Sequence, residues 1–198
     1  WMLDFPLLLF VLILFFLGAG RKKSSFFLAP LAVMGLTTIV VEIVVIIAYQ
    51  TFFGYLYQRI ALLFSSLMFG LFCGSLHGKN RKRKSLVQIL LIQFGFIFLL
   101  SLFLILLNAK PPEPLFFIFL ICLGFLGGDL FIVSNQLYLE TKKNYGIGYG
   151  LDLMGSFLGA LFASSFLIPI VGLHLLLIYI LLLNSLCFLF LLWEFKAK

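Results

Sequence analysis

Three acidic residues lie well inside apolar segments of the sequence, away from the N-terminal end of the chain: Glu42, Asp129 and Asp152. A carboxylate at membrane depth is strongly unfavourable unless it has a partner, a proton or water beside it. Such a residue can couple transport to a proton or cation, or it can hold helices together as a hydrogen-bonded neutral group. Both interpretations stay open for Glu42 and Asp129. Asp152 lies about one turn into its segment, near the positive end of the helix dipole, which favours a structural role.

Two amide side chains lie at the predicted depth of Asp129. At about 1.5 Å per residue from the same side, Gln93, Asn184 and Asp129 all lie about eight or nine residues inside their segments. We therefore expect one polar layer in which these amides bond a neutral Asp129 carboxyl group. Glu42 belongs to a different layer, and its nearest candidate cation is Arg59.

The histidines and cysteines do not combine into a metal, haem or nucleophile site. His77 and His174 fall at opposite ends of the predicted segments, so they cannot ligate one haem iron together. Cys73, Cys122 and Cys187 lie far apart within apolar segments and lack CxxC spacing, which is typical of packing residues. The sequence has no Ser–His–Asp set and no phosphate-binding glycine loop. We therefore expect no enzyme activity and no cofactor.

The composition is that of a polytopic membrane protein. Of the 198 residues, 64% are hydrophobic and 11% are charged, whereas about a quarter of an average soluble domain is charged. This excludes a disordered chain and a disulfide-rich secreted domain, and it predicts an all-α transmembrane bundle. Because a spanning helix needs about 20 residues, the length allows about seven or eight spans and no soluble catalytic domain. The net charge of +7 is typical of basic loops that contact membrane lipids, so we expect no nucleic-acid partner.

Seven apolar segments have spanning length: 2–20, 26–49, 60–77, 85–107, 115–138, 147–171 and 173–193. The last two are separated only by Gly172. The first contains Asp4 and has its basic residues after the apolar core, which favours a retained anchor over a cleaved signal peptide. We therefore expect an N-terminal anchor helix and basic loop at 1–25 and a six-helix bundle at 26–198.

Basic residues divide unequally between the two sides of this arrangement. Arg59 and Lys110 fall on one side, and the other twelve fall on the opposite side. Because cytoplasmic loops carry the excess of Lys and Arg, the N-terminus is predicted outside and the C-terminus inside, in the bacterial cytoplasmic (inner) membrane. The largest cluster is the predicted cytoplasmic basic loop, with Lys79, Arg81, Lys82, Arg83 and Lys84.

Glycines recur at the spacing that lets transmembrane helices approach closely. They lie on the third, fifth and sixth segments, and this spacing favours close packing within the bundle over a dimer face. They are Gly70, Gly74 and Gly78, then Gly124 and Gly128, then Gly155 and Gly159. Pro169 and the Gly127–Gly128 pair are the expected places for a helix to bend.

Two stretches, 35–78 and 127–173, combine several of these features. The first has Glu42 within an apolar helix and the Gly70–Gly74 step. The second has Tyr149-x-x-Asp152-Leu-x-Gly155 leading to Gly159-Ala160. On these features the chain resembles the membrane domain of bacterial fused spermidine-synthase-like proteins, which is similar to half of a major-facilitator transporter. The resemblance implies a six-helix half-transporter-like unit with one extra N-terminal helix.

The chain departs from that family in two places. Gly78 stands where the transporter loop motif has Asp, which argues against transporter-like gating through this loop. No strand is followed by a glycine-rich turn and an acidic ribose ligand, so the aminopropyltransferase domain is missing. We therefore expect no polyamine synthesis by this chain alone.

Two functions remain after these exclusions. The first is a non-catalytic integral membrane subunit that anchors or scaffolds a larger complex, with membrane lipids and other subunits, or a second copy, as partners. The alternative is a transporter or carrier of a small polyamine-like cation that uses Glu42 and Asp129 as charge partners. Carboxylates that face a water-filled cavity favour transport, and carboxylates that face another helix favour the scaffold.

Overall fold

The computed structural model describes residues 25–54, 57–81, 85–109, 111–141 and 146–196. Within these ranges the chain is helical and contains no strand, so the predicted all-α class is confirmed. A short 3-10 helix, η1 (Ser25–Leu28), leads into α2 (Ala29–Phe53), α3 (Tyr57–Asn80), α4 (Leu86–Asn108) and α5 (Glu113–Thr141). The last described range contains α6 (Gly146–Phe162), the π-helical turn η2 (Ala163–Leu167) and α7 (Ile168–Lys196).

Five described helices are long and apolar enough to cross a membrane. Four of them, α2 to α5, match the predicted second to fifth segments, and the fifth is the continuous stretch Gly146–Trp193. By length and composition, the chain is a membrane-embedded helical protein. The predicted total of seven spans is not shown. The first segment, 2–20, lies outside the described residues, and the sixth and seventh fall within one helical stretch.

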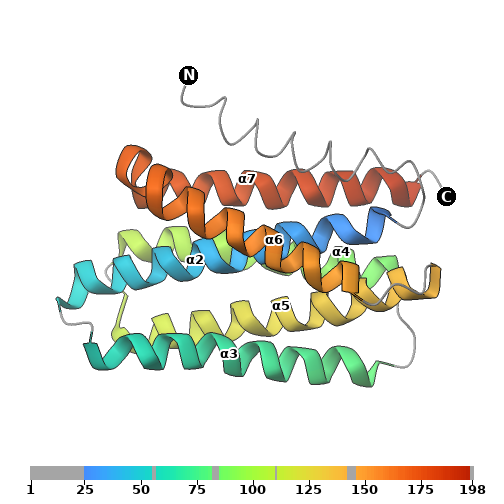
Figure 1. Cartoon of the computed structure of the whole chain (residues 1–198). Helices are drawn as coiled ribbons and strands as arrows, with labels where there is room; N and C mark the ends of the chain where they lie inside the picture. The colour runs from blue at the N-terminus through green and yellow to red at the C-terminus, as the bar shows by residue number, and fades with distance from the viewer. Residues whose placement is uncertain (1–24, 55–56, 82–84, 110, 142–145, 197–198) are drawn as a thin grey trace.

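The stretch that holds α6, η2 and α7 is not straight. Gly172 has φ 81° and ψ 170°, a non-helical conformation that glycine adopts without a steric penalty. Shortly before it, Pro169 lacks the N–H group that would bond the carbonyl oxygen of Ser165, and the π-helical turn includes Ser165. Figure 1 shows the chain reversing direction between α6 and α7. Gly172 is also the residue that separates the last two predicted segments.

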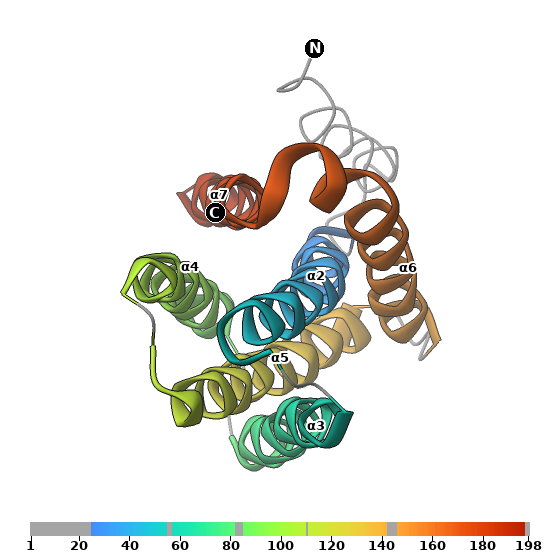
Figure 2. The ribbon, with the colours of Figure 1, turned by 90° about the vertical axis from the view of Figure 1, so that its left-hand side faces the viewer.

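α2 is the central helix of the bundle. In Figure 2 it is surrounded by α4, α5, α6 and α7, whereas α3 lies on the far side of α5. Burial follows this arrangement: 78% of the most apolar 18-residue stretch of α2 is buried, against 22% of the corresponding stretch of α3. Val41, Val44 and Val45 of α2 are fully enclosed. A helix that is apolar on all sides is thus covered on all sides, as its composition requires.

Successive helices run in opposite directions, so their termini gather at two ends of the bundle (Figure 1). The basic end holds the starts of α2, α4 and α6 and the last residues of α3, where Lys79 and Arg81 lie. The opposite end holds Arg59 and Glu113 near the starts of α3 and α5. Most basic residues behind the predicted orientation, including 82–84, lie outside the described ranges. The orientation therefore stays a prediction.

Candidate functional site

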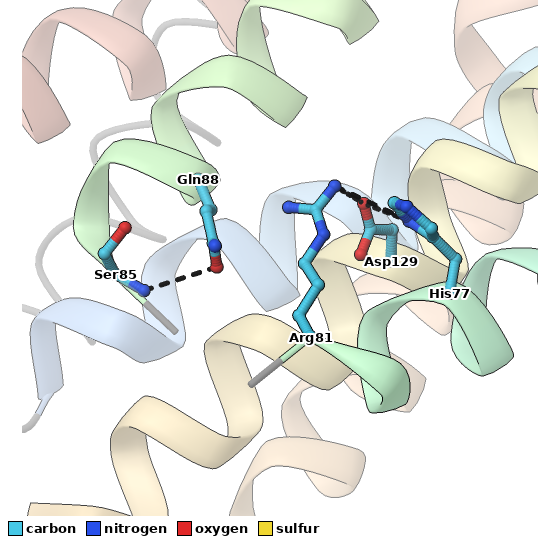
Figure 3. Close-up of polar contacts among 5 residues, drawn as sticks. All are labelled: His77, Arg81, Ser85, Gln88 and Asp129. Atoms are coloured by element: carbon cyan, nitrogen blue, oxygen red, sulfur yellow. Dashed lines mark hydrogen bonds and ion pairs between the residues drawn. The ribbon is translucent and has the colours of Figure 1, made fainter. Parts of the chain in front are cut away.

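Asp129 lies buried between α5 and α3 with two basic partners. Only 2% of its side chain is exposed, and its Oδ2 atom lies 3.0 Å from Nη2 of Arg81 and 3.3 Å from Nδ1 of His77 (Figure 3). Nη2 of Arg81 is also 3.5 Å from Nδ1 of His77. The two basic residues are four positions apart at the end of α3, so they share one face. The carboxylate is therefore compensated by the neighbouring helix.

Gly78 makes room for this cluster. A Cβ atom at position 78 would lie 2.9 Å from Oδ1 of Asp129, so a larger side chain would press on the carboxylate. The acidic group of the transporter loop motif, placed at position 78, would bring a second carboxylate against the first.

Glycines bring the backbones of α3 and α5 into direct contact. A Cβ atom on Gly74 would collide with the carbonyl oxygen of Phe125, and one on Gly128 would collide with that of Leu71. The glycines of this α3–α5 seam are Gly70, Gly74, Gly78, Gly124 and Gly128. Close backbone approach of this kind favours helix association where lipid tails are as apolar as the side chains.

A second glycine seam joins α6 to α2. A Cβ atom on Gly155 would collide with the carbonyl oxygen of Ala32, and one on Gly159 would lie 2.8 Å from Cγ2 of Ile39. The spacing of these glycines indicates a close-packing face but does not specify the partner helix, which is α2 rather than α3 or α5.

The polar layer expected around Asp129 forms without Asp129. Gln93 of α4 donates to Oδ1 of Asn184 at 2.8 Å, and Asn184 of α7 donates to the hydroxyl of Thr37 at 2.8 Å. All three side chains are buried. The expectation that these amides bond Asp129 is wrong because depth along an axis does not fix the face of a helix. Asp129 points to α3, whereas the amides meet beside α2.

The ion pair expected between Glu42 and Arg59 is also absent from the described part of the chain. Arg59 pairs with Glu113 instead, with 3.1 Å between Nε and Oε1, and the Tyr49 hydroxyl donates to the same Oε1 at 2.7 Å. Arg59 and Glu113 lie near the starts of neighbouring parallel helices, α3 and α5, so they meet at one end of the bundle. Glu42 lies almost two turns before Tyr49 on α2, too deep for Arg59 to reach.

Glu42 and Asp152 have no ionic partner within the described residues. Glu42 is 2% exposed, and its Oε1 atom is buried without a hydrogen-bond partner there. Asp152 is half-buried on α6, with its carboxyl group against Gly35 of α2. Three atoms of α5 are also buried without partners in the described ranges: Ser134 Oγ, Asn135 Oδ1 and the second carboxylate oxygen of Asp129, Oδ1. The bundle therefore contains paired and unpaired buried polar groups.

The histidines and cysteines do not form a common site in the described part of the chain. Within the described residues, no group of three or more His, Cys, Asp or Glu side chains is placed to hold a metal ion. His77 belongs to the Asp129 cluster, whereas His174 is exposed on α7. The thiols of Cys73, Cys122 and Cys187 are free.

Several polar residues that the fold brings into contact were not predicted as partners from the sequence. His77 was considered only as a haem ligand, although its spacing of four from Arg81 places both on one helix face. Thr38 and Ser156 both bond the carbonyl oxygen of Gly35. Their signal lies in the four-residue steps Thr38–Glu42 and Asp152–Ser156, each of which aligns a hydroxyl with a carboxyl group.

Comparison of the chain with protein-family models, with curated proteins and with solved structures gives no match.

Proposed function

We propose that this chain is a non-catalytic integral membrane subunit that anchors or scaffolds a larger membrane complex. The observation that carries the proposal is the pairing of Asp129. A carboxylate that already contacts Arg81 and His77 serves to join α5 to α3. Its Oδ2 atom lies against the Arg81 cation, which disfavours a transported cation at the same carboxylate. The Gln93–Asn184–Thr37 network likewise joins three helices.

The outer face of α3 supports a protein partner. α3 has the lowest hydropathy of the five candidate spans, 1.8 against 2.5 to 2.8, yet it is the least buried of them. A helix surrounded by lipid tails alone is expected to be among the most apolar. Its exposed side includes Phe64, Phe69 and Phe72. We infer that another subunit or a second copy covers part of this face, and that lipid covers the rest.

We further propose seven spans, with the N-terminus outside and the C-terminus inside the bacterial cytoplasmic membrane. Support comes from the charge split and from the alternating helix directions in Figure 1. On this proposal α6 and α7 cross separately, the bend at Gly172 lies outside, and residues 2–20 form the first span. Seven spans would correspond to the extra N-terminal helix and the six-helix half-transporter-like unit that the resemblance implies. Labelling of a single cysteine introduced at position 80 only from the outside would contradict it.

The alternative function is a carrier of a small cation. Glu42 favours it, because its Oε1 atom is buried and has no partner among the described residues. Asp129 does not, because its basic neighbours would repel an incoming polyamine-like cation. A carrier role therefore requires Glu42 alone to serve as the charge partner.

The test of the scaffold is purification of the full chain from its native membrane in mild detergent. We expect defined subunits, or a second copy, to co-migrate at fixed stoichiometry. Phe72→Ala on the exposed face of α3 should weaken that association. Phe98→Ala, on the exposed face of α4, is the matched control and should leave it unchanged. A chain that purifies alone, and that carries out cation uptake abolished by Glu42→Gln, would favour the carrier.

A further inference from the structure

We propose that Glu42 is a proton-binding site that exchanges protons with the basic end of the bundle along a polar track of Asp152, Ser156 and Thr38, whose two hydroxyls meet at the carbonyl group of Gly35. This goes beyond the scaffold role and does not depend on it, because a subunit without carrier activity can bind a proton in the same way. The starting observation is that Glu42 is 2% exposed and that its Oε1 atom has no partner among the described residues.

Gly35 is the meeting point of the track. A Cβ atom there would collide with the backbone carbonyl oxygen of Asp152 and would lie 2.7 Å from its Oδ1 atom, so the Asp152 backbone and carboxyl group both lie against this glycine. The Gly35 carbonyl oxygen accepts hydrogen bonds from the hydroxyls of Thr38 and Ser156, each at 3.1 Å. One carboxyl group and two hydroxyls from two helices therefore converge on this glycine.

The track continues to Glu42 along one face of α2. Glu42 lies four residues after Thr38, so the two side chains share that face about 6 Å apart along the axis. At its other end the track meets the start of α6, since Asp152 lies six residues after Gly146 and is half-buried. Successive side chains of the track lie about one helical turn apart, and the proposal places one hydrogen-bonded water molecule in the gap between Thr38 and Glu42.

The chemistry needs only carboxyl groups, hydroxyls and water. An isolated ionised carboxylate is strongly unfavourable among apolar side chains, so Glu42 without a cation holds a proton. When the proton leaves, the O–H bond of Glu42 breaks and a water or hydroxyl oxygen of the track accepts it. The return transfer breaks the O–H bond of the Asp152 carboxyl group, which regains a proton from water at the basic end. No other reactant is consumed.

The other carboxyl groups and the histidines on the helices around α2 lie away from this track, with Glu194 near the C-terminal end of α7. Asp129 and Glu113 of α5 pair with residues of α3, and Glu140 is exposed at the end of α5. α4 has no titratable side chain, and His174 of α7 is exposed. Within the described ranges Asp152 is thus the carboxyl group placed to relay protons to Glu42.

The test is infrared spectroscopy of the purified full chain in lipid nanodiscs. The stretching band of a protonated carboxyl group that disappears in Glu42→Gln belongs to Glu42. After transfer from H₂O to D₂O, this band shifts as O–H becomes O–D, and the rate of the shift measures proton access. We expect Asp152→Asn to slow this exchange by about tenfold or more, as for other removed proton-transfer groups, and Thr38→Val to slow it as well.

Three controls separate the track from general loosening of the bundle. Thr51→Val removes an exposed hydroxyl from the same helix, Ser164→Ala removes one from η2, and Asp129→Asn neutralises a carboxylate outside the track. All three should exchange at the wild-type rate. If Asp152→Asn does not fold, Thr38→Val and Ser156→Ala decide the question. The absence of a Glu42 band in the wild type, or unchanged exchange in the track variants, would overturn the proposal. Subunit co-migration is a separate measurement and does not depend on this outcome.

Discussion

The α3–α5 and α2–α6 contacts use the same packing device but differ in their buried acids. Both seams bring helix backbones together through glycines, at Gly74 and Gly128 in one and at Gly155 in the other. In the first seam the buried carboxylate, Asp129, is paired with two basic side chains. In the second, Asp152 and the nearby Glu42 have no such partners among the described residues. Close packing alone therefore does not assign a role to a buried acid. Its partners do.

The largest expected effect breaks the α3–α5 seam. Gly128→Leu should abolish the folded bundle, because the new side chain meets backbone that cannot move aside. The loss should exceed the about 1–3 kcal/mol typical of overpacking. Thermal unfolding in detergent is the measurement. Gly150→Leu is the matched control, since nothing lies within 4 Å of a Cβ atom there. Equal stability of the two variants would show that the seam does not hold the helices together.

A smaller effect is expected when the ion pair of that seam is broken. Arg81→Met leaves the Asp129 carboxylate buried with His77 alone, which should cost up to about 3 kcal/mol of unfolding free energy. Arg59→Met at the opposite end should cost at most about 1 kcal/mol, because that pair is partly exposed. Denaturant titration of both variants gives the comparison. A larger loss for Arg59→Met would reverse the ranking of the two ends.

An intermediate effect is expected in the Gln93–Asn184–Thr37 network at the centre of the bundle. Asn184→Leu removes hydrogen bonds to α4 and α2 and should cost about 1–2 kcal/mol. Ser185→Ala is the control, because its hydroxyl bonds the backbone of its own helix. Unfolding measured in the same detergent should separate the two variants. No difference between them would mean that the network adds nothing to helix association.

The smallest effect is expected at the unpaired acid. Glu42→Gln keeps the size of the side chain and removes no ion pair found in the described residues, so its unfolding free energy should stay within about 0.5 kcal/mol of wild type. Thermal unfolding at neutral pH checks this. A large loss would reveal a partner of the carboxylate and would remove the contrast with Asp129.

Much of the helical architecture could be predicted from the sequence. Long apolar segments separated by charged residues predict α2 to α5 because a spanning helix needs a minimum apolar length. The bends were expected at Pro169 and at Gly127–Gly128; the chain breaks near the first, at Gly172, whereas α5 continues as one helix through the glycine pair. The glycine spacing likewise indicates the faces of α3 and α5 that meet. The number and orientation of the spans depend largely on residues outside the described ranges, and they stay predictions.

The partners of the buried polar groups could not be predicted. Depth counting placed Asp129 beside Gln93 and Asn184, but a helix presents side chains all around its axis, and only packing decides which neighbour each one meets. Arg59 was assigned to Glu42 by proximity along the chain, yet Glu113 reaches it from a parallel helix. Gly35 shows no side-chain chemistry in the sequence, and its role arises only because α6 packs against it.

The Asp129 carboxylate serves, on this proposal, to join α5 to α3 through Arg81. A double-mutant cycle tests it most directly, with Arg81→Met, Asp129→Asn and the double variant compared by denaturant unfolding in detergent. We expect the double variant to be more stable than the sum of the two single losses implies, with a coupling free energy of about 1–3 kcal/mol. Strictly additive losses would contradict the claim, because they would mean that the two side chains do not stabilise each other in the folded bundle.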